Sequence, residues 1–274
     1  MAESERQGSG MVELKTRGEI EAMREAGRVV ARALTAAREN AAVGVTLKEL
    51  DEIAHSVITD AGATSPFLNY RPHFAMTPFP AVICASVNDA ALHGIPDAYR
   101  LEDGDLLSID CGATLDGWTG DAAISFTVGR ARPADSRLIA ETSAALDAGI
   151  AAARPDGKLG DISAAIAGVG RAAGLGICGD FGGHGIGRQM HEDPQVPNFG
   201  KPNDGKRMKS GLVIAVEPMV NAGAPDVEEL DDDWTAVTRD RSMSAHFEHT
   251  IAILDEGPWV LTRPSSTPGN PGHP

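Results

Sequence analysis

Residues 106–126, which read LLSIDCGATLDGWTGDAAISF, are the stretch on which the fold depends. Asp116 and Gly117 form the strongest two-residue signal for a β-hairpin turn, and strand-like residues flank them on both sides. A two-residue turn pairs Asp110 with Ala123, and Asp121 then points to the same face of the hairpin as Asp110. Diagonal neighbours of this kind lie roughly 7–8 Å apart. The sequence therefore predicts two carboxylates that can converge on one site.

The surroundings of these aspartates decide between two interpretations. On an isolated hairpin both side chains could face solvent, where carboxylates are common. Asp110, however, lies within the apolar run LLSIDCG. Two buried carboxylates without a cation are costly, because burial disfavours the charged form. We therefore expect this pair to bind metal ions.

Helical patterns lie on both sides of the hairpin along the chain. Thr16 and Thr46 each begin a capping box, and apolar residues follow each at helical spacing. The first helix should run to about Asn40, and the second should stop at Gly62. A second helix pair is expected at residues 136–153 and 161–173.

Strand-like segments follow each helix pair, at residues 80–129 and 176–261. The order helix, helix, strands thus occurs twice. It predicts an α+β fold of two pseudo-symmetric halves, each a helix pair with antiparallel strands, around a central cleft. We expect a single domain at residues 13–263, between flexible tails at residues 1–12 and 264–274 that lack periodicity.

The composition excludes several classes of protein. A net charge of −15 over 274 residues opposes binding to nucleic acids or anionic membranes. No apolar run approaches the roughly 18–20 residues of a membrane helix, and the first ten residues lack the apolar core of a secretory signal. Cys84, Cys111 and Cys178 are far apart, which fits a reducing compartment. We predict a cytoplasmic protein, with the acidic run at residues 226–233 as a solvated loop.

Three further residues are candidate metal ligands. His184 lies among glycines in FGGHGIGRQMH, Glu217 follows the apolar run GLVIAV, and Glu248 lies in SAHFEHT. Alone, each is more typical of a turn or a strand edge. Together with the two aspartates they carry four negative charges, which balance two divalent cations and leave positions open for water and substrate. Oxygen-rich ligation with one histidine points to Mn, Fe, Co or Zn.

A phosphate-binding loop is the alternative for this Gly-rich region. GLGICG at residues 174–179 matches the pattern G-x-G-x-x-G. It follows a predicted helix and leads into strand-like residues, which is the reverse of the strand-to-helix context that phosphate binding needs. We therefore do not expect a phosphate site.

Five segments, taken in chain order, resemble the signature segments of type I methionine aminopeptidases: SVNDAALHGIP, LLSIDCGATLDGWTGDAA, FGGHGIGRQMHEDPQVPN, IAVEPMVN and SAHFEHT. The resemblance extends over residues 16–261 and implies the pita-bread fold of that family, with a dimetal cleft between the halves. Only 25 residues separate His191 from Glu217, which leaves no room for the helical insertion typical of type II enzymes.

The resemblance also implies roles for the site residues. His184 and Glu217 would complete one metal site, Asp110 would chelate the other ion, and Asp121 and Glu248 would bridge the two. A hydroxide between the ions would attack the peptide carbonyl, with Glu217 as the proton shuttle. His191 would donate to the carbonyl oxygen and His93 would act near the scissile nitrogen.

A pocket for the methionine side chain is implied beside the metals. The matching residues are Tyr70, Phe79, Cys84, Met190 and Trp234. Met190 stands where many members carry an aromatic residue, and residues 71–78 form a longer segment than is usual there. By the same resemblance Asn88 and Ser244 lie near a monovalent-cation site.

The implied activity is removal of the initiator methionine from nascent polypeptides, with a preference for a small second residue. We expect a monomer, with the ribosome as a candidate partner and no nucleic-acid or membrane partner. An Xaa-Pro aminopeptidase or prolidase is the nearest rival, although those usually carry a large N-terminal domain, whereas about 16 residues precede the first helix here. A binding module without catalysis should have lost ligands, and all five are present.

Overall fold

The computed structural model describes residues 12–72 and 75–264, and its helices form two consecutive pairs. The pairs are α1 (Arg17–Asn40) with α2 (Leu47–Asp60), and α3 (Pro133–Ala152) with α4 (Leu159–Ala173). Both predicted capping boxes are confirmed, since the hydroxyls of Thr16 and Thr46 accept from the backbone N–H groups of Glu19 and Glu49. α3 begins three residues earlier than predicted, because Pro133 occupies its first turn, where a missing N–H costs nothing.

The predicted hairpin is confirmed residue by residue. It consists of β3 (Leu106–Leu115) and β4 (Trp118–Thr127), with Asp110 opposite Ala123. Asp116 and Gly117 have φ values of 51° and 75°, as a type I′ turn requires. β1 (Ile83–Val87) pairs with the other edge of β3 and places Cys84 opposite Asp110.

The strands of the second half form a larger antiparallel sheet, in the order β14-β13-β8-β6-β7. Its members are β6 (Gly182–Gly185), β7 (Glu192–Pro197), β8 (Val213–Val216), β13 (His249–Leu254) and β14 (Gly257–Val260). The remaining strands are β2 (Ala90–Leu92), β5 (Gly176–Ile177), β9 (Met219–Asn221), β10 (Val227–Glu229), β11 (Ala236–Thr238) and β12 (Ser244–His246).

The two halves share a sheet, a feature that the repeated pattern did not predict. β2 of the first half pairs with β11 of the second, in the order β10-β11-β2. The prediction of a loop at residues 226–233 is therefore wrong for β10, whose residues pair with β11 and bury Val227, whereas most of this acidic run is solvent-exposed as predicted.

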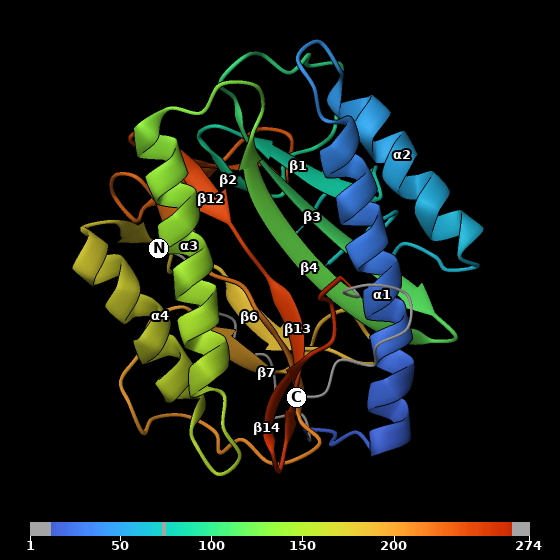
Figure 1. The fold of residues 1–274 in the computed structure, drawn as a ribbon, viewed down its shortest axis with the longest axis vertical. Coiled ribbons are helices and arrows are strands. Elements are labelled where there is room, and N and C mark those ends of the chain that lie inside the picture. The colour runs from blue at the N-terminus through green and yellow to red at the C-terminus, as the bar shows by residue number, and fades with distance from the viewer. Residues whose placement is uncertain (1–11, 73–74, 265–274) are drawn as a thin grey trace.

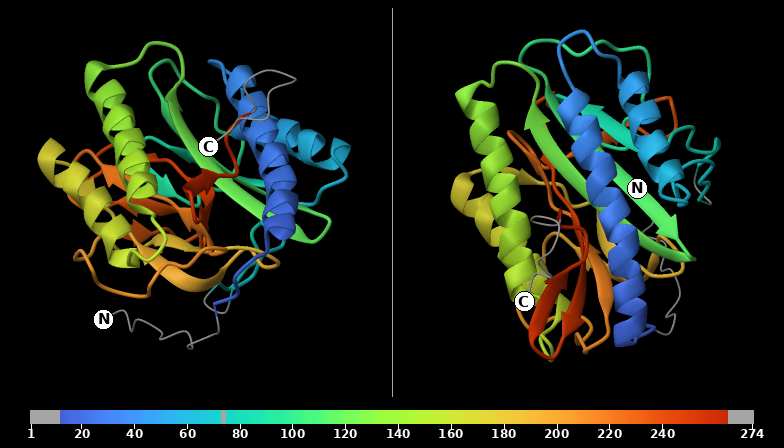
Figure 2. Two further views of the ribbon diagram at one scale, coloured as in Figure 1. Left: turned by 60° about the horizontal axis from the view of Figure 1, so that its bottom comes forward. Right: turned by 45° about the vertical axis from the view of Figure 1, so that its right-hand side comes forward.

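Each helix pair covers the outer side of its own strands (Figure 1). α1 packs across β3 and β4, whereas α4 contacts β7 and α3 contacts β12. Two large apolar cores result, one between the first helix pair and β1, β3 and β4, and one between the second pair and β7, β8 and β13. Figure 2 shows the strands of both halves meeting between the helix pairs. The predicted α+β class, with two similar halves, is confirmed.

Two further predictions concern the ends and the cysteines. The tails predicted at residues 1–12 and 264–274 lie, apart from Val12 and Pro264, outside the described residues. Within the described ranges no helix is long and apolar enough to span a membrane. Cys84, Cys111 and Cys178 are buried thiols without disulfide partners.

Candidate metal centre

The five predicted ligands come together at the junction of the two halves. Asp110 lies on β3, Asp121 on β4 and His184 on β6, while Glu217 follows β8 and Glu248 precedes β13. The backbone of Glu248 exchanges hydrogen bonds of 3.0 and 3.4 Å with Ala123, the residue opposite Asp110. Asp121 is tied to β13 by Thr250, whose hydroxyl accepts from its N–H and donates to its carbonyl. Backbone pairing across the halves thus positions the cluster.

The side chains of the cluster have the geometry of a cation site. Ligand atoms of Asp121, His184 and Glu248 lie within 4.8 Å of one another. Glu217 Oε1 lies 3.5 Å from His184 Nε2. One oxygen each of Asp110, Asp121 and Glu248 is buried and has no hydrogen-bond partner among the described residues. Buried, unpartnered carboxylate oxygens are the donors that divalent cations satisfy, so the residues fit a metal.

Burial also changes the acidity of these carboxyl groups. It raises the pKa of Asp110 to about 7 and, together with the nearby charge of Asp110, the pKa of Glu217 to about 8. Burial followed by the neighbouring carboxylates raises the pKa of Asp121 and of Glu248 well above their usual range. Without a metal the cluster therefore retains protons at neutral pH.

The stability of the metal-free protein should fall as the pH rises above about 6.5. A carboxyl group whose pKa is raised by folding stabilises the folded state below its unfolded pKa, and this contribution is lost as the pH rises through the folded pKa. For Asp110 and Glu217 that window runs from about pH 4 to about pH 8. Below about pH 6.5 the buried histidines, whose pKa values burial lowers to about 3–4, have the opposite effect, so the net fall is expected between about pH 6.5 and pH 8. We expect the unfolding free energy to drop by about 1.4 kcal/mol per pH unit for each such group. Urea unfolding in EDTA should show the drop and saturation with Mn²⁺ should remove it, whereas a flat profile in EDTA would contradict the proposed cluster.

Two histidines flank the cluster without belonging to it. The His191 ring lies 4.3 Å from the His184 ring between centroids, and its Nδ1 is 2.8 Å from the Tyr70 hydroxyl. Burial, followed by His184, lowers the pKa of His191 to about 3. His93 follows β2 with a left-handed φ of 57°, and burial, followed by His191, lowers its pKa to about 4. Both rings are therefore neutral at physiological pH.

The predicted pocket residues form one apolar cluster. Tyr70, Phe79, Cys84, Met190 and Trp234 pack together with Phe67, Ala75 and Ala81. The Trp234 ring lies edge-on to Phe79 at 5.1 Å, and its Nε1 donates to the Thr77 carbonyl at 3.2 Å. The second part of the longer segment at residues 71–78 therefore lines the cluster, through Ala75 and Thr77.

Asn88 and Ser244 are also neighbours, since the Ser244 N–H donates to the Asn88 carbonyl at 2.9 Å. Both side chains have protein partners. The Asn88 amide donates to Asp105 and the Ser244 hydroxyl to Asn221, each at 2.8 Å. A monovalent-cation site at these residues stays a prediction.

His246 also lies at the site, although it was not predicted as a site residue from the sequence. Its Nε2 lies 3.8 Å from Glu217 Oε2, and ligand atoms of Glu217, His246 and Glu248 fall within 4.8 Å of one another. The sequence does contain an indication of this position. Residues two apart on an extended chain share a face, and His246 precedes the predicted ligand Glu248 by two residues.

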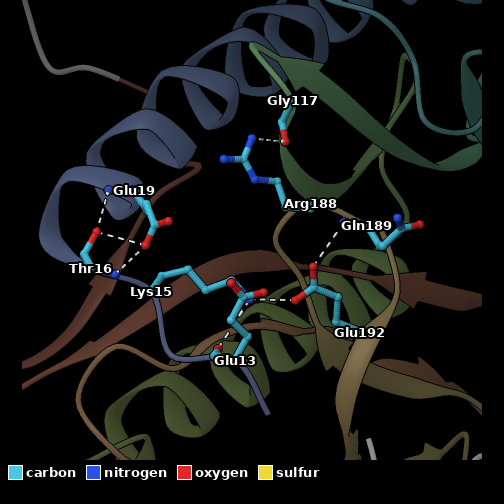
Figure 3. Close-up of polar contacts among 8 residues, drawn as sticks. All are labelled: Glu13, Lys15, Thr16, Glu19, Gly117, Arg188, Gln189 and Glu192. Atoms are coloured by element: carbon cyan, nitrogen blue, oxygen red, sulfur yellow. Dashed lines mark hydrogen bonds and ion pairs between the residues drawn. The ribbon is translucent and has the colours of Figure 1, made fainter. Parts of the chain in front are cut away.

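The loop that carries Met190 and His191 is anchored on both sides (Figure 3). Lys15, whose side chain is 2% exposed, donates at 2.6 Å to Glu192, and the other oxygen of Glu192 accepts from the Gln189 N–H at 3.0 Å. On the other side Arg188 donates to the Gly117 carbonyl and stacks on Trp118, with its guanidinium carbon 3.7 Å from the ring centroid. The tip of the β3–β4 hairpin and the segment before α1 therefore fix the position of His191.

Lys15→Met is expected to destabilise the protein by roughly 3–5 kcal/mol, because it leaves Glu192 as a largely buried charge without its partner. Urea denaturation of the full chain measures the change. Arg17→Met is the control, since Arg17 pairs with Glu21 and Glu256 at the surface and such exposed pairs contribute less than about 1 kcal/mol each. Equal stabilities of the Lys15 variant and the control would contradict a structural role for the buried pair.

Comparisons with known proteins identify the family of this chain. Residues 21–255 match the model of metallopeptidase family M24. The chain is 50% identical over 262 residues to methionine aminopeptidase 1 of Mycobacterium tuberculosis, covering 93% of this chain and 96% of that protein. The structure of methionine aminopeptidase from Thermotoga maritima matches with a TM-score of 0.88 and 36% identity, over 92% of this chain and 100% of that one. The predicted pita-bread fold is thereby confirmed.

A prolidase from Pyrococcus furiosus shares the fold at lower similarity. Its TM-score is 0.71 at 22% identity, and the match covers 92% of this chain but 66% of that chain. At this identity the likeness extends to the fold alone.

Proposed function

The chain belongs to metallopeptidase family M24, and we propose that it is a metalloaminopeptidase that removes the N-terminal methionine from polypeptides. The main support for this proposal is that the apolar cluster lies beside the five predicted metal ligands. Cys84 of the apolar cluster lies opposite Asp110, and Met190 directly precedes His191. A methionine side chain in the apolar cluster would bring its own carbonyl next to the carboxylates.

Asp110, Asp121, His184, Glu217 and Glu248 would hold two divalent ions. Their unpartnered oxygens and four potential negative charges support this assignment. When bound, such ions polarise a carbonyl and lower the pKa of water to about 7, which supplies a hydroxide nucleophile at neutral pH. The oxygen-rich ligand set with one histidine suits Mn, Fe, Co or Zn.

The remaining roles belong to side chains around the carboxylates. Glu217, whose carboxylate lies 3.5 Å from His184 Nε2, would carry the proton from the nucleophile to the leaving amine. His191, a neutral ring oriented by Tyr70, would donate to the oxygen of the attacked carbonyl. His93, packed edge-on against Phe181 and Trp234, would hold the scissile nitrogen.

The pocket would set the preference for the first residue. Tyr70, Phe79, Cys84, Met190 and Trp234 would surround an unbranched, flexible side chain such as methionine, which packs well against aromatic rings. We further propose a small second residue, nascent polypeptides as substrates and a cytoplasmic location, with the ribosome as a candidate partner. Asn88 and Ser244 stay candidates for a monovalent-cation site.

Paired peptide assays test this function against its rival. With Mn²⁺ or Co²⁺ supplied to the stripped protein, Met-Ala-Ser should be cleaved faster than an Xaa-Pro peptide and faster than a peptide with a bulky second residue. Faster release from Xaa-Pro peptides would overturn the proposed substrate class in favour of a prolidase-like activity. If none of these peptides is cleaved with either metal, the proposed peptidase activity is wrong.

A further inference from the structure

We propose that His246 is a positioning residue of the metal centre, which donates a hydrogen bond from Nε2 to Oε2 of Glu217. The inference rests on the proposed metal site and assigns a role to a residue outside the five ligands. His246 is 2% exposed, and its Nε2 is buried without a hydrogen-bond partner among the described residues. A buried donor of this kind normally has a partner.

The backbone of His246 is fixed, so its ring cannot easily turn elsewhere. Its N–H donates to the Ser125 hydroxyl and its carbonyl accepts from the same hydroxyl, both at 2.8 Å. The Ser125 hydroxyl also lies 2.7 Å from that of Ser108 on the neighbouring strand. β12 further pairs His246 with Met219, two residues beyond Glu217. These contacts hold the imidazole toward Glu217.

Two imidazoles bracket the Glu217 carboxylate, one on each oxygen. His184 Nε2 lies 3.5 Å from Oε1, and His246 Nε2 lies 3.8 Å from Oε2. If Oε1 shares an ion with His184, Oε2 is the oxygen that remains for a donor. A movement of the Glu217 carboxylate by roughly 1 Å brings Oε2 to the ordinary N–H···O distance of about 2.9 Å from His246 Nε2. The Asn198 amide holds the Glu217 carbonyl at 2.9 Å, so side-chain rotation is the available movement.

A donor role fits the cluster better than direct ligation by His246. The four carboxylates already balance the charge of two divalent ions, His184 adds a neutral ligand, and the reaction needs open positions for water and a carbonyl. A second imidazole on an ion would occupy one of them. A donor to Oε2 would instead keep Glu217 bound through a single oxygen. Loss of such a supporting hydrogen bond typically lowers metal affinity by roughly 10- to 100-fold.

Metal binding to full-length variants distinguishes these roles. Co²⁺ affinity of chelator-treated protein is measured by calorimetry, and the visible spectrum of the bound Co²⁺ reports its coordination. His246→Gln keeps an N–H donor and should bind Co²⁺ within about threefold of the unmodified protein, with an unchanged spectrum. His246→Leu lacks the donor and should bind roughly 10- to 100-fold more weakly. His246→Ala gives the same readout if the leucine variant fails to fold.

Two results would overturn the proposal. If both His246→Leu and His246→Ala bind Co²⁺ as tightly as the unmodified protein, the ring of His246 does not support Glu217 as a metal ligand. A changed spectrum and equal loss of affinity in His246→Gln and His246→Leu would show that His246 is itself a ligand. His249→Gln is the matched control, because His249 is a nearby, largely buried histidine whose Nδ1 contacts Thr262 at 2.8 Å. If the unmodified protein binds Co²⁺ but cleaves no Met peptide, the proposed function fails while the role of His246 stands.

Discussion

Asp121→Asn is expected to weaken divalent-metal binding by more than about 100-fold and to remove peptide cleavage with it. The side chain of Asp121 is buried next to Asp110, and its ligand oxygen shares a site with His184 and Glu248. Loss of a residue that merely supports a ligand costs roughly 10- to 100-fold in affinity, so loss of a carboxylate that we propose binds both ions should cost more.

The same substitution should stabilise the metal-free protein. Burial, followed by the charges of Asp110 and Glu217, raises the pKa of Asp121, so the metal-free protein must take up a proton there when it folds at neutral pH. A neutral amide removes the free-energy cost of that proton uptake. A gain of 1 kcal/mol would raise the melting temperature by about 2–4 °C. The variant should therefore melt above the unmodified protein in EDTA and below it in saturating Mn²⁺.

Calorimetry for metal affinity and thermal melts with and without EDTA measure both effects. Asp116→Asn is the control, because Asp116 lies exposed at the turn of the same hairpin and asparagine tolerates its positive φ. Normal metal binding by Asp121→Asn would remove Asp121 from the ligand set.

His191→Ala is expected to lower kcat for Met-Ala-Ser by roughly 100- to 1,000-fold, the usual loss when one donor to a developing oxyanion is removed. KM should change little, because the donor acts mainly in the transition state. Since the pKa of His191 is lowered to about 3, the ring donates as a neutral imidazole throughout the working pH range.

Steady-state kinetics of two variants test this role. Tyr70→Phe removes only the hydroxyl that contacts His191 Nδ1, so its kcat should fall less than that of His191→Ala. Metal affinity should stay normal in both variants, which separates the effect from loss of the ions. An unchanged kcat in His191→Ala would exclude this histidine from catalysis.

Local signals in the sequence predicted the hairpin register and the helix starts. Asp116 and Gly117 set the turn, which fixed Asp110 opposite Ala123, and the capping boxes at Thr16 and Thr46 fixed two helix starts. These features depend on residues close together in the chain. The roles of His184, Glu217 and Glu248 depended instead on combining weak signals with the family resemblance.

Long-range contacts could not be predicted in the same way. The pairing of β2 with β11 joins segments about 145 residues apart, and nothing in three-residue strands specifies such a partner. The contact of Lys15 with Glu192 likewise depends on the packing of the segment before α1 against the second half. The spacing of His246 from Glu248 indicated a shared face, but its contact with Glu217 depends on the pairing of β12 with β9, which the sequence does not predict.

We propose that one site at the junction of the halves holds two metal ions. An anomalous-diffraction experiment on crystals of the Mn²⁺-loaded protein would locate these ions. We predict two peaks, one within ligand distance of His184 and Glu217 and one within ligand distance of Asp110, with Asp121 and Glu248 reaching both. Peaks away from these five residues, or a single peak at saturating Mn²⁺, would contradict the two-ion site.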